Sequence, residues 1–229
     1  ASTHGRFLHL RRVWKNEKWQ TAFSFFGLLL GGTKREIKKT REYMSQSRQL
    51  AAIMFTDIVG YTALMGNDEQ KAFAILSKNR DLQKPFIEQF NGKWIKELGD
   101  GVMASFNTVS DAVNAAIKIQ EACNAAKDFK LRIGIHLGEV VFENDDVFGD
   151  GVNIAARIQS IAAPGGIYIS ESVYNNVSNK ESIKTEFVKV EQLKNVKEPT
   201  RIYRVITGFD DAVIAKMPVV KIKRKKGRE

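Results

Sequence analysis

The pattern of apolar and polar positions between residues 50 and 207 predicts a mixed series of strands and helices. Residues 50–59 form an apolar run that one charged residue, Asp57, interrupts, which is typical of a buried strand. Helices are expected at 68–90, 108–126 and 153–162, where apolar residues recur at helical spacing. Further strands are expected at 92–98, 102–106, 131–142, 167–170, 183–190 and 201–207.

The order of these elements predicts an α+β fold with a ferredoxin-like βαββαβ core and extra strands. Gly99-Asp100-Gly101 predicts a tight hairpin turn between the second and third strands. In this arrangement two helices cover one face of an antiparallel sheet. The other face must then be buried by something else.

The two ends of the chain differ from this central domain, which is expected to span residues 49–208. Residues 1–48 form a basic helical or linker segment, and their apolar stretch 19–30 is too short to cross a bilayer. Two interpretations stay open: this segment docks at a membrane interface, or it packs as an ordinary helix on the domain or on a second copy. Residues 209–229 form a basic tail that is expected to be disordered.

Composition narrows the class of protein. The chain is 43% hydrophobic and 27% charged, which is ordinary for a globular protein and excludes wholesale disorder. The single cysteine, Cys123, excludes a disulfide framework and a multi-cysteine zinc site. The net charge of +10 divides into +8 for residues 1–50, −4 for 51–215 and +6 for 216–229. Because the folded centre is acidic, no nucleic-acid partner is expected.

Two aspartates are candidates for chemistry. Asp57 lies within an apolar strand, where an ionised carboxylate is costly unless it is paired or bound to metal. Gly60 follows closely and would let backbone N–H groups approach a phosphate. Asp100 occupies the hairpin turn, so both carboxylates can converge at one end of the sheet and suit Mg²⁺ or Mn²⁺. The alternative is structural: Asp-Gly is a turn dipeptide, and a strand aspartate can be an ion-paired residue.

Four motifs, in this order, strongly resemble the class III nucleotidyl cyclases. They are the sequences at residues 55–62 (FTDIVGYT), 98–101 (LGDG), 132–138 (RIGIHLG) and 148–157 (FGDGVNIAAR). The resemblance covers residues 50–206. It implies a cyclase catalytic domain that works as a head-to-tail dimer.

The resemblance also assigns roles at the phosphate end of the substrate. Asp57 and Asp100, with the backbone of Ile58, match the residues that bind two Mg²⁺ or Mn²⁺ ions per site. The residues implied to bind phosphate are Gly60, Tyr61, Arg132 and Lys197. Because the loop length at Lys197 departs from the family pattern, Lys194 is kept as an alternative.

At the other end of the substrate, the resemblance implies base selection and transition-state contacts. Asn153 and Arg157 match the catalytic pair that orients the ribose and stabilises the transition state, and their spacing places both on one helix face. Lys96 and Asp146 match the pair that reads adenine, with Asp145 as the alternative if the alignment slips by one. The alternative is that these four residues are ordinary polar side chains in contact with solvent and have no role in binding.

These roles imply an adenylate cyclase that converts ATP to 3′,5′-cyclic AMP and pyrophosphate. One subunit of a homodimer would supply Asp57, Asp100 and Arg132, and the other the base-reading and catalytic pairs. Two alternatives stay open: a guanylyl or relaxed-specificity cyclase, and a catalytically silent nucleotide-sensing or dimerisation module. The expected location is the cytoplasm, with contact at the inner face of the membrane through residues 1–48 left open.

Overall fold

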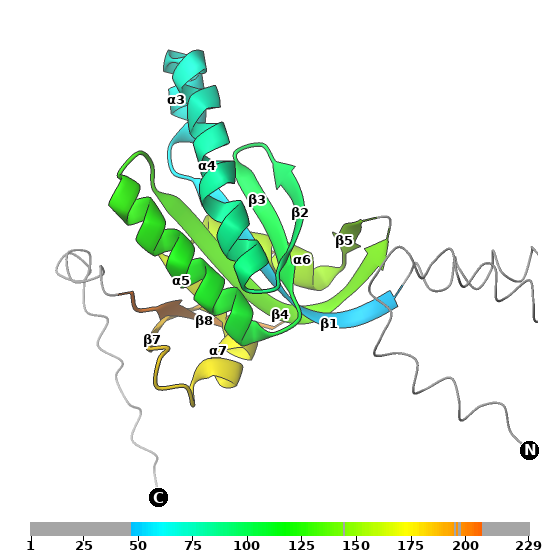
Figure 1. Cartoon of the computed structure of the whole chain (residues 1–229). Coiled ribbons are helices and arrows are strands. Elements are labelled where there is room, and N and C mark those ends of the chain that lie inside the picture. The colour runs from blue at the N-terminus through cyan, green and yellow to red at the C-terminus, as the bar shows by residue number, and fades with distance from the viewer. Residues whose placement is uncertain (1–46, 144, 195, 197, 208–229) are drawn as a thin grey trace, which may run out of the picture. The chain divides into compact units, whose positions relative to one another are not determined.

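The computed structural model of the chain describes residues 47–143, 145–194, 196 and 198–207 (Figure 1). The predicted basic segment 1–48, except for its last two residues, and the predicted tail 209–229 lie outside these residues. Within the described ranges, no helix has the length and apolar character needed to cross a membrane.

Every element predicted between residues 50 and 207 is present, with small shifts at the ends. The strands are β1 (Ser47–Ile58), β2 (Lys93–Leu98), β3 (Gly101–Phe106), β4 (Leu131–Glu143), β5 (Asp146–Phe148), β6 (Ile167–Ser170), β7 (Thr185–Glu191) and β8 (Thr200–Val205). The helices are α3 (Tyr61–Asn67), α4 (Glu69–Gln89), α5 (Val109–Ala126), α6 (Asp150–Ser160) and α7 (Glu171–Val177).

The sheet confirms the predicted core and adds to it. Its strand order is β2-β3-β1-β4-β6-β8-β7, with β5 paired to β4. The segment β2-β3-β1-β4 has the order of a ferredoxin-like core, and β3 pairs antiparallel with both β1 and β2. Beyond this core, the added strand β6 pairs in parallel with β4.

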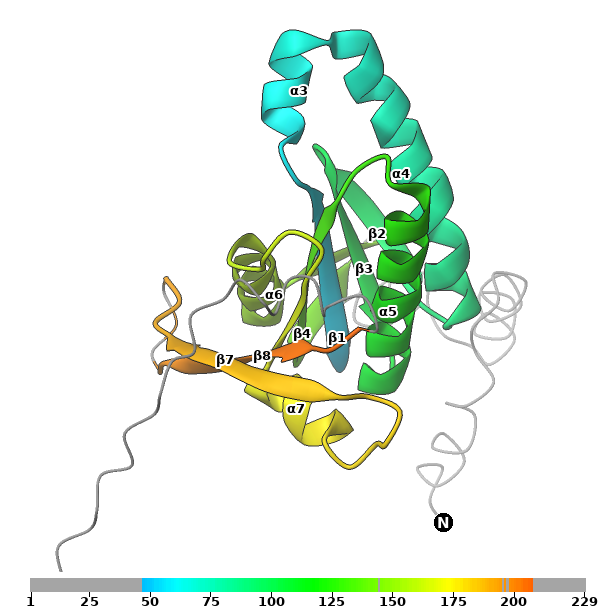
Figure 2. The ribbon, with the colours of Figure 1, turned by 90° about the vertical axis from the view of Figure 1, so that its left-hand side faces the viewer.

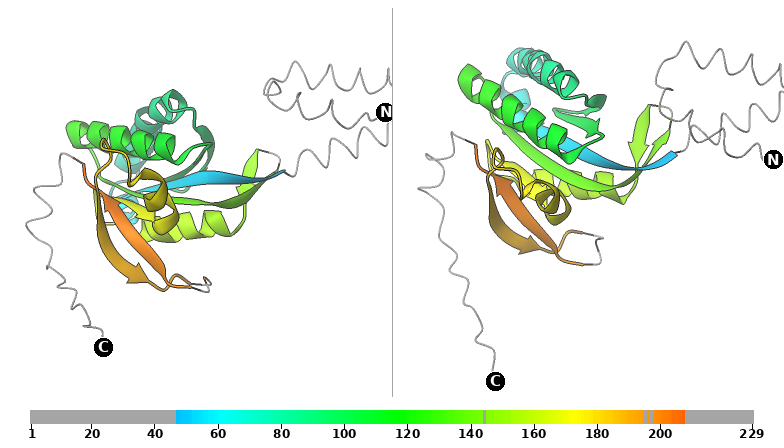
Figure 3. Two further views of the ribbon diagram at one scale, coloured as in Figure 1. Left: turned by 90° about the horizontal axis from the view of Figure 1, so that it is seen from below. Right: turned by 60° about the horizontal axis from the view of Figure 1, so that its bottom comes forward.

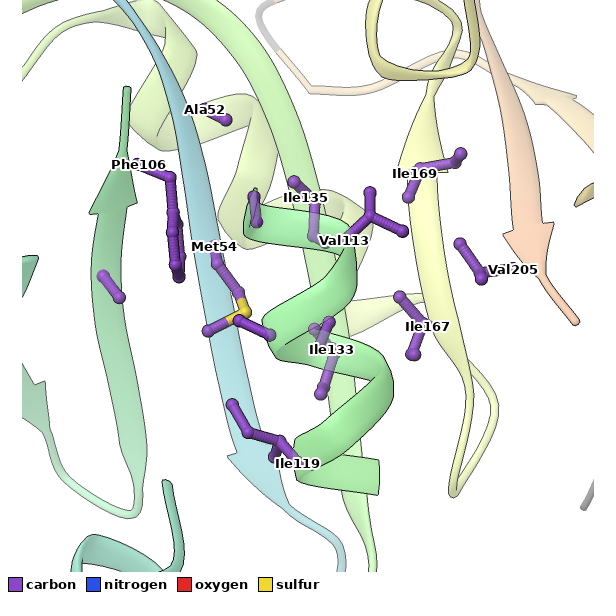
Figure 4. Close-up of a cluster of buried hydrophobic side chains, with 14 of the residues drawn as sticks. Ala52, Met54, Phe106, Val113, Ile119, Ile133, Ile135, Ile167, Ile169 and Val205 are labelled. Carbon is purple, nitrogen blue, oxygen red and sulfur yellow. The ribbon is translucent and has the colours of Figure 1, made fainter. Parts of the chain in front are cut away.

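Helices lie on both faces of the sheet. Figure 2 shows α4 and α5 on one face and α6 on the other. Alternate residues of β1 point to opposite faces, so Met54 packs beneath α5 (Figure 4) while Ile53 packs with Ala155 of α6. The face that the sequence left uncovered is therefore partly covered by α6. The β7–β8 hairpin extends the sheet beyond β6 (Figure 3).

The buried face of α4 differs from the predicted stripe. Phe73, one of the apolar residues at helical spacing in this helix, is 54% exposed, and the polar residues Asn79 and Gln83 are buried. Gln83 Nε2 donates to Asn79 Oδ1 at 2.5 Å, which satisfies part of their hydrogen-bonding capacity. Periodicity alone cannot reveal such a pair, because it ranks polar residues as exposed.

Candidate active site

Two acidic residues meet where β1 ends. The β1–β3 register pairs Thr56 with Val102, which brings Asp57 beside the β2–β3 turn that contains Asp100. Gly101 permits this approach, since a Cβ there would lie 2.6 Å from the Thr56 carbonyl oxygen. Burial and the negative charge of Asp57 raise the pKa of Asp100. The sequence-based expectation that these two carboxylates converge is therefore confirmed.

Arg132 partly balances this negative charge. Its Nη2 donates to Asp57 Oδ2 across β1 and β4, in a partly buried ion pair. The Nε of the same guanidinium is buried and has no hydrogen-bond partner within the described part of the chain. Arg132, predicted to contact phosphate, thus lies beside the acids with one buried donor still available.

The loop after β1 exposes its backbone next to the acids. Gly60 has φ of +78°, in the left-handed region that favours glycine, and it precedes α3. No described atom lies within 4 Å of where its Cβ would be. Ile58 is the last residue of β1 and Tyr61 is the first residue of α3, so the two flank this loop. Ile58, Gly60 and Tyr61 therefore lie at the edge where the acids meet.

The acid cluster fits a hard divalent cation. Asp57 and Asp100 supply only oxygen donors, and their mutual repulsion is what a bound cation would relieve. No group of three or more His, Cys, Asp and Glu side chains suited to a metal occurs among the described residues. A site with two protein carboxylates is typical of Mg²⁺ or Mn²⁺ that takes its other ligands from a substrate's phosphates.

A second cluster joins β2 to β5. Lys96 Nζ donates to Asp146 Oδ2 at 2.6 Å, and the Val147 N–H donates to Asp146 Oδ1 at 2.7 Å. Both hydrogen bonds lower the pKa of Asp146, and the bond from Lys96 has the larger effect. The β2–β3 register shifts between Trp94 and Lys96, an irregularity of the kind that re-aims a side chain.

The alternative residue Asp145 is placed differently. Its carboxylate pairs with Lys93 at 2.7 Å, and its side chain is 92% exposed. The geometry therefore selects Asp146 as the partner of Lys96.

Asn153 and Arg157 lie on α6, as the spacing predicted, and α6 packs closely on β4. A Cβ on Gly134 would lie 2.2 Å from the backbone nitrogen of Gln159, so only glycine allows this contact. Asn153 is exposed and Arg157 partly exposed. Neither side chain has a hydrogen-bond or ion-pair partner in the portion of the chain that is described.

The structure thus forms two separate clusters from the predicted residues. One contains Asp57, Asp100 and Arg132, and the other Lys96 and Asp146. Lys197 lies outside the described residues, and its alternative Lys194 is exposed.

A cavity of about 350 Å³ opens beside the start of α6 and is lined in part by His136, Glu139 and Ile154. None of the predicted site residues lines this cavity. It therefore gives no support for placing the substrate there.

Sequence reasoning missed one residue of the second cluster. The Phe148 ring centroid lies 5.9 Å from Lys96 Nζ. The available signal was an aromatic residue two positions after Asp146, because alternate strand residues share a face.

The fold is that of the class III cyclase catalytic domains. The adenylate/guanylate cyclase/hydrolase from Silicibacter pomeroyi superposes with a TM-score of 0.66 at 33% identity, over 70% of this chain and 98% of that one. The adenylyl cyclase CyaB from P. aeruginosa has a TM-score of 0.65 at 22% identity, over 70% of this chain and 95% of that one. At that identity CyaB supports the fold alone.

Residues 43–207 match the model of the adenylate and guanylate cyclase catalytic domain, and the chain belongs to this family. Among its relatives, "Putative adenylate cyclase 3" of Rhizobium meliloti is 35% identical over 164 residues, 68% of this chain and 28% of that protein. The adenylate cyclase of Anabaena cylindrica is 30% identical over 191 residues, which cover 72% of this chain and 38% of that protein. The chain thus spans well under half the length of these relatives. The resemblance seen in the four sequence motifs is confirmed.

Proposed function

We propose that this domain is an adenylate cyclase that converts ATP to 3′,5′-cyclic AMP and pyrophosphate. The observation that carries the choice of ATP is the contact between Lys96 and Asp146. An ammonium donor beside a carboxylate acceptor complements adenine, which presents an acceptor at N1 and a donor at its amino group. Guanine presents the reverse pattern, and a buried mispaired polar group costs about 1–3 kcal/mol.

The reaction closes a ring within the nucleotide. The ribose 3′-hydroxyl gives its proton to water and its oxygen bonds to the α-phosphorus, while the bond from that phosphorus to the bridging oxygen breaks and pyrophosphate leaves. Asp57, Asp100 and the backbone of Ile58 are the groups proposed to hold two Mg²⁺ or Mn²⁺ ions. When bound, these ions favour ionisation of the 3′-hydroxyl and neutralise charge on the phosphates.

The remaining roles belong to the chain's own side chains. Arg132, with its buried unpaired Nε, is proposed to hold the polyphosphate, assisted by backbone N–H groups at Gly60 and Tyr61 and by Lys197 or Lys194. Asn153 would orient the ribose, and Arg157 would stabilise charge that develops in the transition state. Neither side chain has a hydrogen-bond or ion-pair partner among the described residues, which leaves both available to a substrate.

A head-to-tail homodimer is proposed because the predicted site residues form two separate clusters within one chain. These are the acid cluster (Asp57, Asp100 and Arg132) and the base-reading cluster (Lys96 and Asp146). Lys96 and Asp100 lie on the same hairpin, yet their proposed tasks are at opposite ends of a nucleotide. Acids from one subunit and the base-reading and catalytic pairs from the other would complete each site. Both sets are intact in one chain, so two equivalent sites are expected.

The test is product identity with purified protein, Mn²⁺ or Mg²⁺, and ATP and GTP assayed side by side. The expected result is cyclic AMP, with GTP converted at least about tenfold less efficiently. Equal or preferred formation of cyclic GMP would replace the proposal with the guanylyl or relaxed-specificity alternative. Nucleotide binding without any cyclic product would favour the silent module.

Contact of residues 1–48 with an anionic membrane surface is a separate proposal, based on the basic and aromatic residues of that segment. Sedimentation with anionic vesicles should be stronger for the full chain than for a variant lacking residues 1–30. Equal partitioning of the two proteins would remove the membrane contact.

A further inference from the structure

The Lys96–Asp146 pair has a third member, the ring of Phe148. The Lys96 ammonium lies 5.9 Å from the ring centroid while it donates to Asp146 at 2.6 Å. Asp146 and Phe148 are the first and last residues of β5, so they share one face of the strand. The ammonium therefore lies between a carboxylate and an aromatic ring that come from the same strand.

Core packing does not account for this ring. Val147, between the two, is 2% exposed and belongs to the cluster beneath α6, whereas Phe148 is 49% exposed. About half of the Phe148 surface is therefore left free for contacts outside the core. The ring lies within the distance at which an aromatic face attracts a cation.

The contact has a consequence for Lys96. A lysine side chain has several rotatable bonds, and a single hydrogen bond leaves much of that freedom. The ring adds a second contact and restricts where the ammonium can lie. The remaining exposed part of the ring is a flat apolar surface beside the donor and acceptor.

We propose that Phe148 is a specificity-determining residue of the base-reading cluster, which holds the Lys96 ammonium in position and offers its ring to the purine. This inference rests on the proposed function of Lys96 and Asp146 as readers of the base. Phe148 acts on the reaction through base recognition, so its effect falls on substrate binding and on the choice between ATP and GTP.

The test compares Phe148→Leu, which removes the ring, with Phe148→Tyr, which keeps it. The matched control is Phe73→Leu, the same change at a 54% exposed phenylalanine on α4. For Phe148→Leu we expect KM for ATP to rise about three- to tenfold, kcat to change less than about twofold, and the preference for ATP over GTP to fall several-fold. Phe148→Tyr should restore KM, and Phe73→Leu should leave both constants unchanged.

Two further measurements separate this role from others. Binding of a non-cyclisable ATP analogue should weaken by the same factor as KM rises. The dimer dissociation constant, measured by sedimentation, should not change, because the proposed role of Phe148 is in base recognition. If the rise in KM came only from weaker dimerisation, it would disappear at high protein concentration. If Phe148→Leu does not fold, Phe148→Met replaces it as the ringless variant.

Identical ATP and GTP constants for the ringless variant and Phe73→Leu would overturn the inference, as would failure of Phe148→Tyr to restore binding. Absence of any cyclic product from the unmodified protein would instead overturn the proposed function. In that case the analogue-binding comparison still decides whether Phe148 contributes to a base site.

Discussion

The acid cluster and the base-reading cluster balance charge in opposite ways. Asp57 and Asp100 are like charges, and their proximity and burial raise the pKa of Asp100. Lys96 and Asp146 are opposite charges, and their hydrogen bond lowers the pKa of Asp146. The two acids repel each other, and only Arg132 offsets part of their negative charge. In the second cluster the positive charge of Lys96 neutralises the negative charge of Asp146.

This difference indicates what each cluster requires from its ligand. The acids gain stability from a cation, since it removes their repulsion. The Lys96–Asp146 pair is already formed and gains nothing from a metal, but its geometry presents a donor beside an acceptor. A phosphate-metal end and a base end of one substrate would account for both clusters.

The largest expected effect comes from breaking the acid cluster. Asp57→Asn should lower cyclic AMP formation by about a hundredfold or more, because it removes a ligand for the cations that stabilise the transition state. Its thermal midpoint should stay close to that of the unmodified protein, since a repulsion is removed along with the ion pair to Arg132. Asp81→Asn, an exposed acid on α4, is the control and should change neither quantity.

A slightly smaller effect is expected from displacing α6 without altering any charge. Gly134→Ala would place a Cβ 2.2 Å from the Gln159 nitrogen, so α6 must shift and move Asn153 and Arg157. A displacement near 1 Å can cost about a hundredfold in rate. Gly66→Ala is the matched control, because an added Cβ there would meet no described atom within 4 Å beyond its own stretch of helix. Equal activity of the two variants would contradict the role given to α6.

A more selective effect is expected at the base-reading cluster. Asp146→Asn should lower the ratio of kcat/KM for ATP to that for GTP by about tenfold, because an amide can also donate to guanine. Asp145→Asn should leave this ratio unchanged, since Asp145 pairs with Lys93. A loss of selectivity in Asp145→Asn alone would show that the assignment is off by one residue.

The smallest effect on catalysis is expected at His136, outside both clusters. Burial lowers the pKa of His136 to about 4, and its Nδ1 lies 2.9 Å from Ser170 Oγ. In the unfolded chain its pKa is about 6.5, so the unfolded state binds the extra proton as pH falls from 6.5 toward 4. The free energy of unfolding should therefore fall over this range, by about 2 kcal/mol between pH 7 and 5.

His136→Gln should reduce this pH dependence while activity at pH 7.5 remains measurable. Urea unfolding at pH 7 and 5, for both proteins, measures the difference. An equal decline in the two proteins would assign the acid sensitivity to other groups.

The fold was largely predictable because long elements carry strong periodic signals, as β1, α5 and β4 do. Three elements were missed, α3, α7 and β5, and each is too short for periodicity to distinguish it from a loop. The parallel pairing of β4 with β6 was also missed, because it depends on how the chain crosses over after α6 and not on a local pattern.

The candidate site was predictable in part. The convergence of Asp57 and Asp100 followed from strand order, because the hairpin returns beside β1. The choice between Asp145 and Asp146 did not follow from strand order. The two residues are adjacent in a short acidic turn, and only the structure shows which of them contacts Lys96. The ion pair of Arg132 with Asp57 and the contact of Phe148 with Lys96 join residues far apart in the sequence. Such contacts follow from packing and have no local signature.

The most direct test of the account mixes Asp57→Ala with Lys96→Ala, after dissociation and reassociation, at an ATP concentration at which neither protein alone forms product. Heterodimers would hold one site in which both clusters are intact, so random pairing should restore about a quarter of unmodified activity. A mixture of Asp57→Ala with Asp100→Ala, both altered in the same cluster, should remain inactive. No recovery in the first mixture, with heterodimers demonstrated, would contradict the claim that each working site is built from the acid cluster of one subunit and the base-reading cluster of the other.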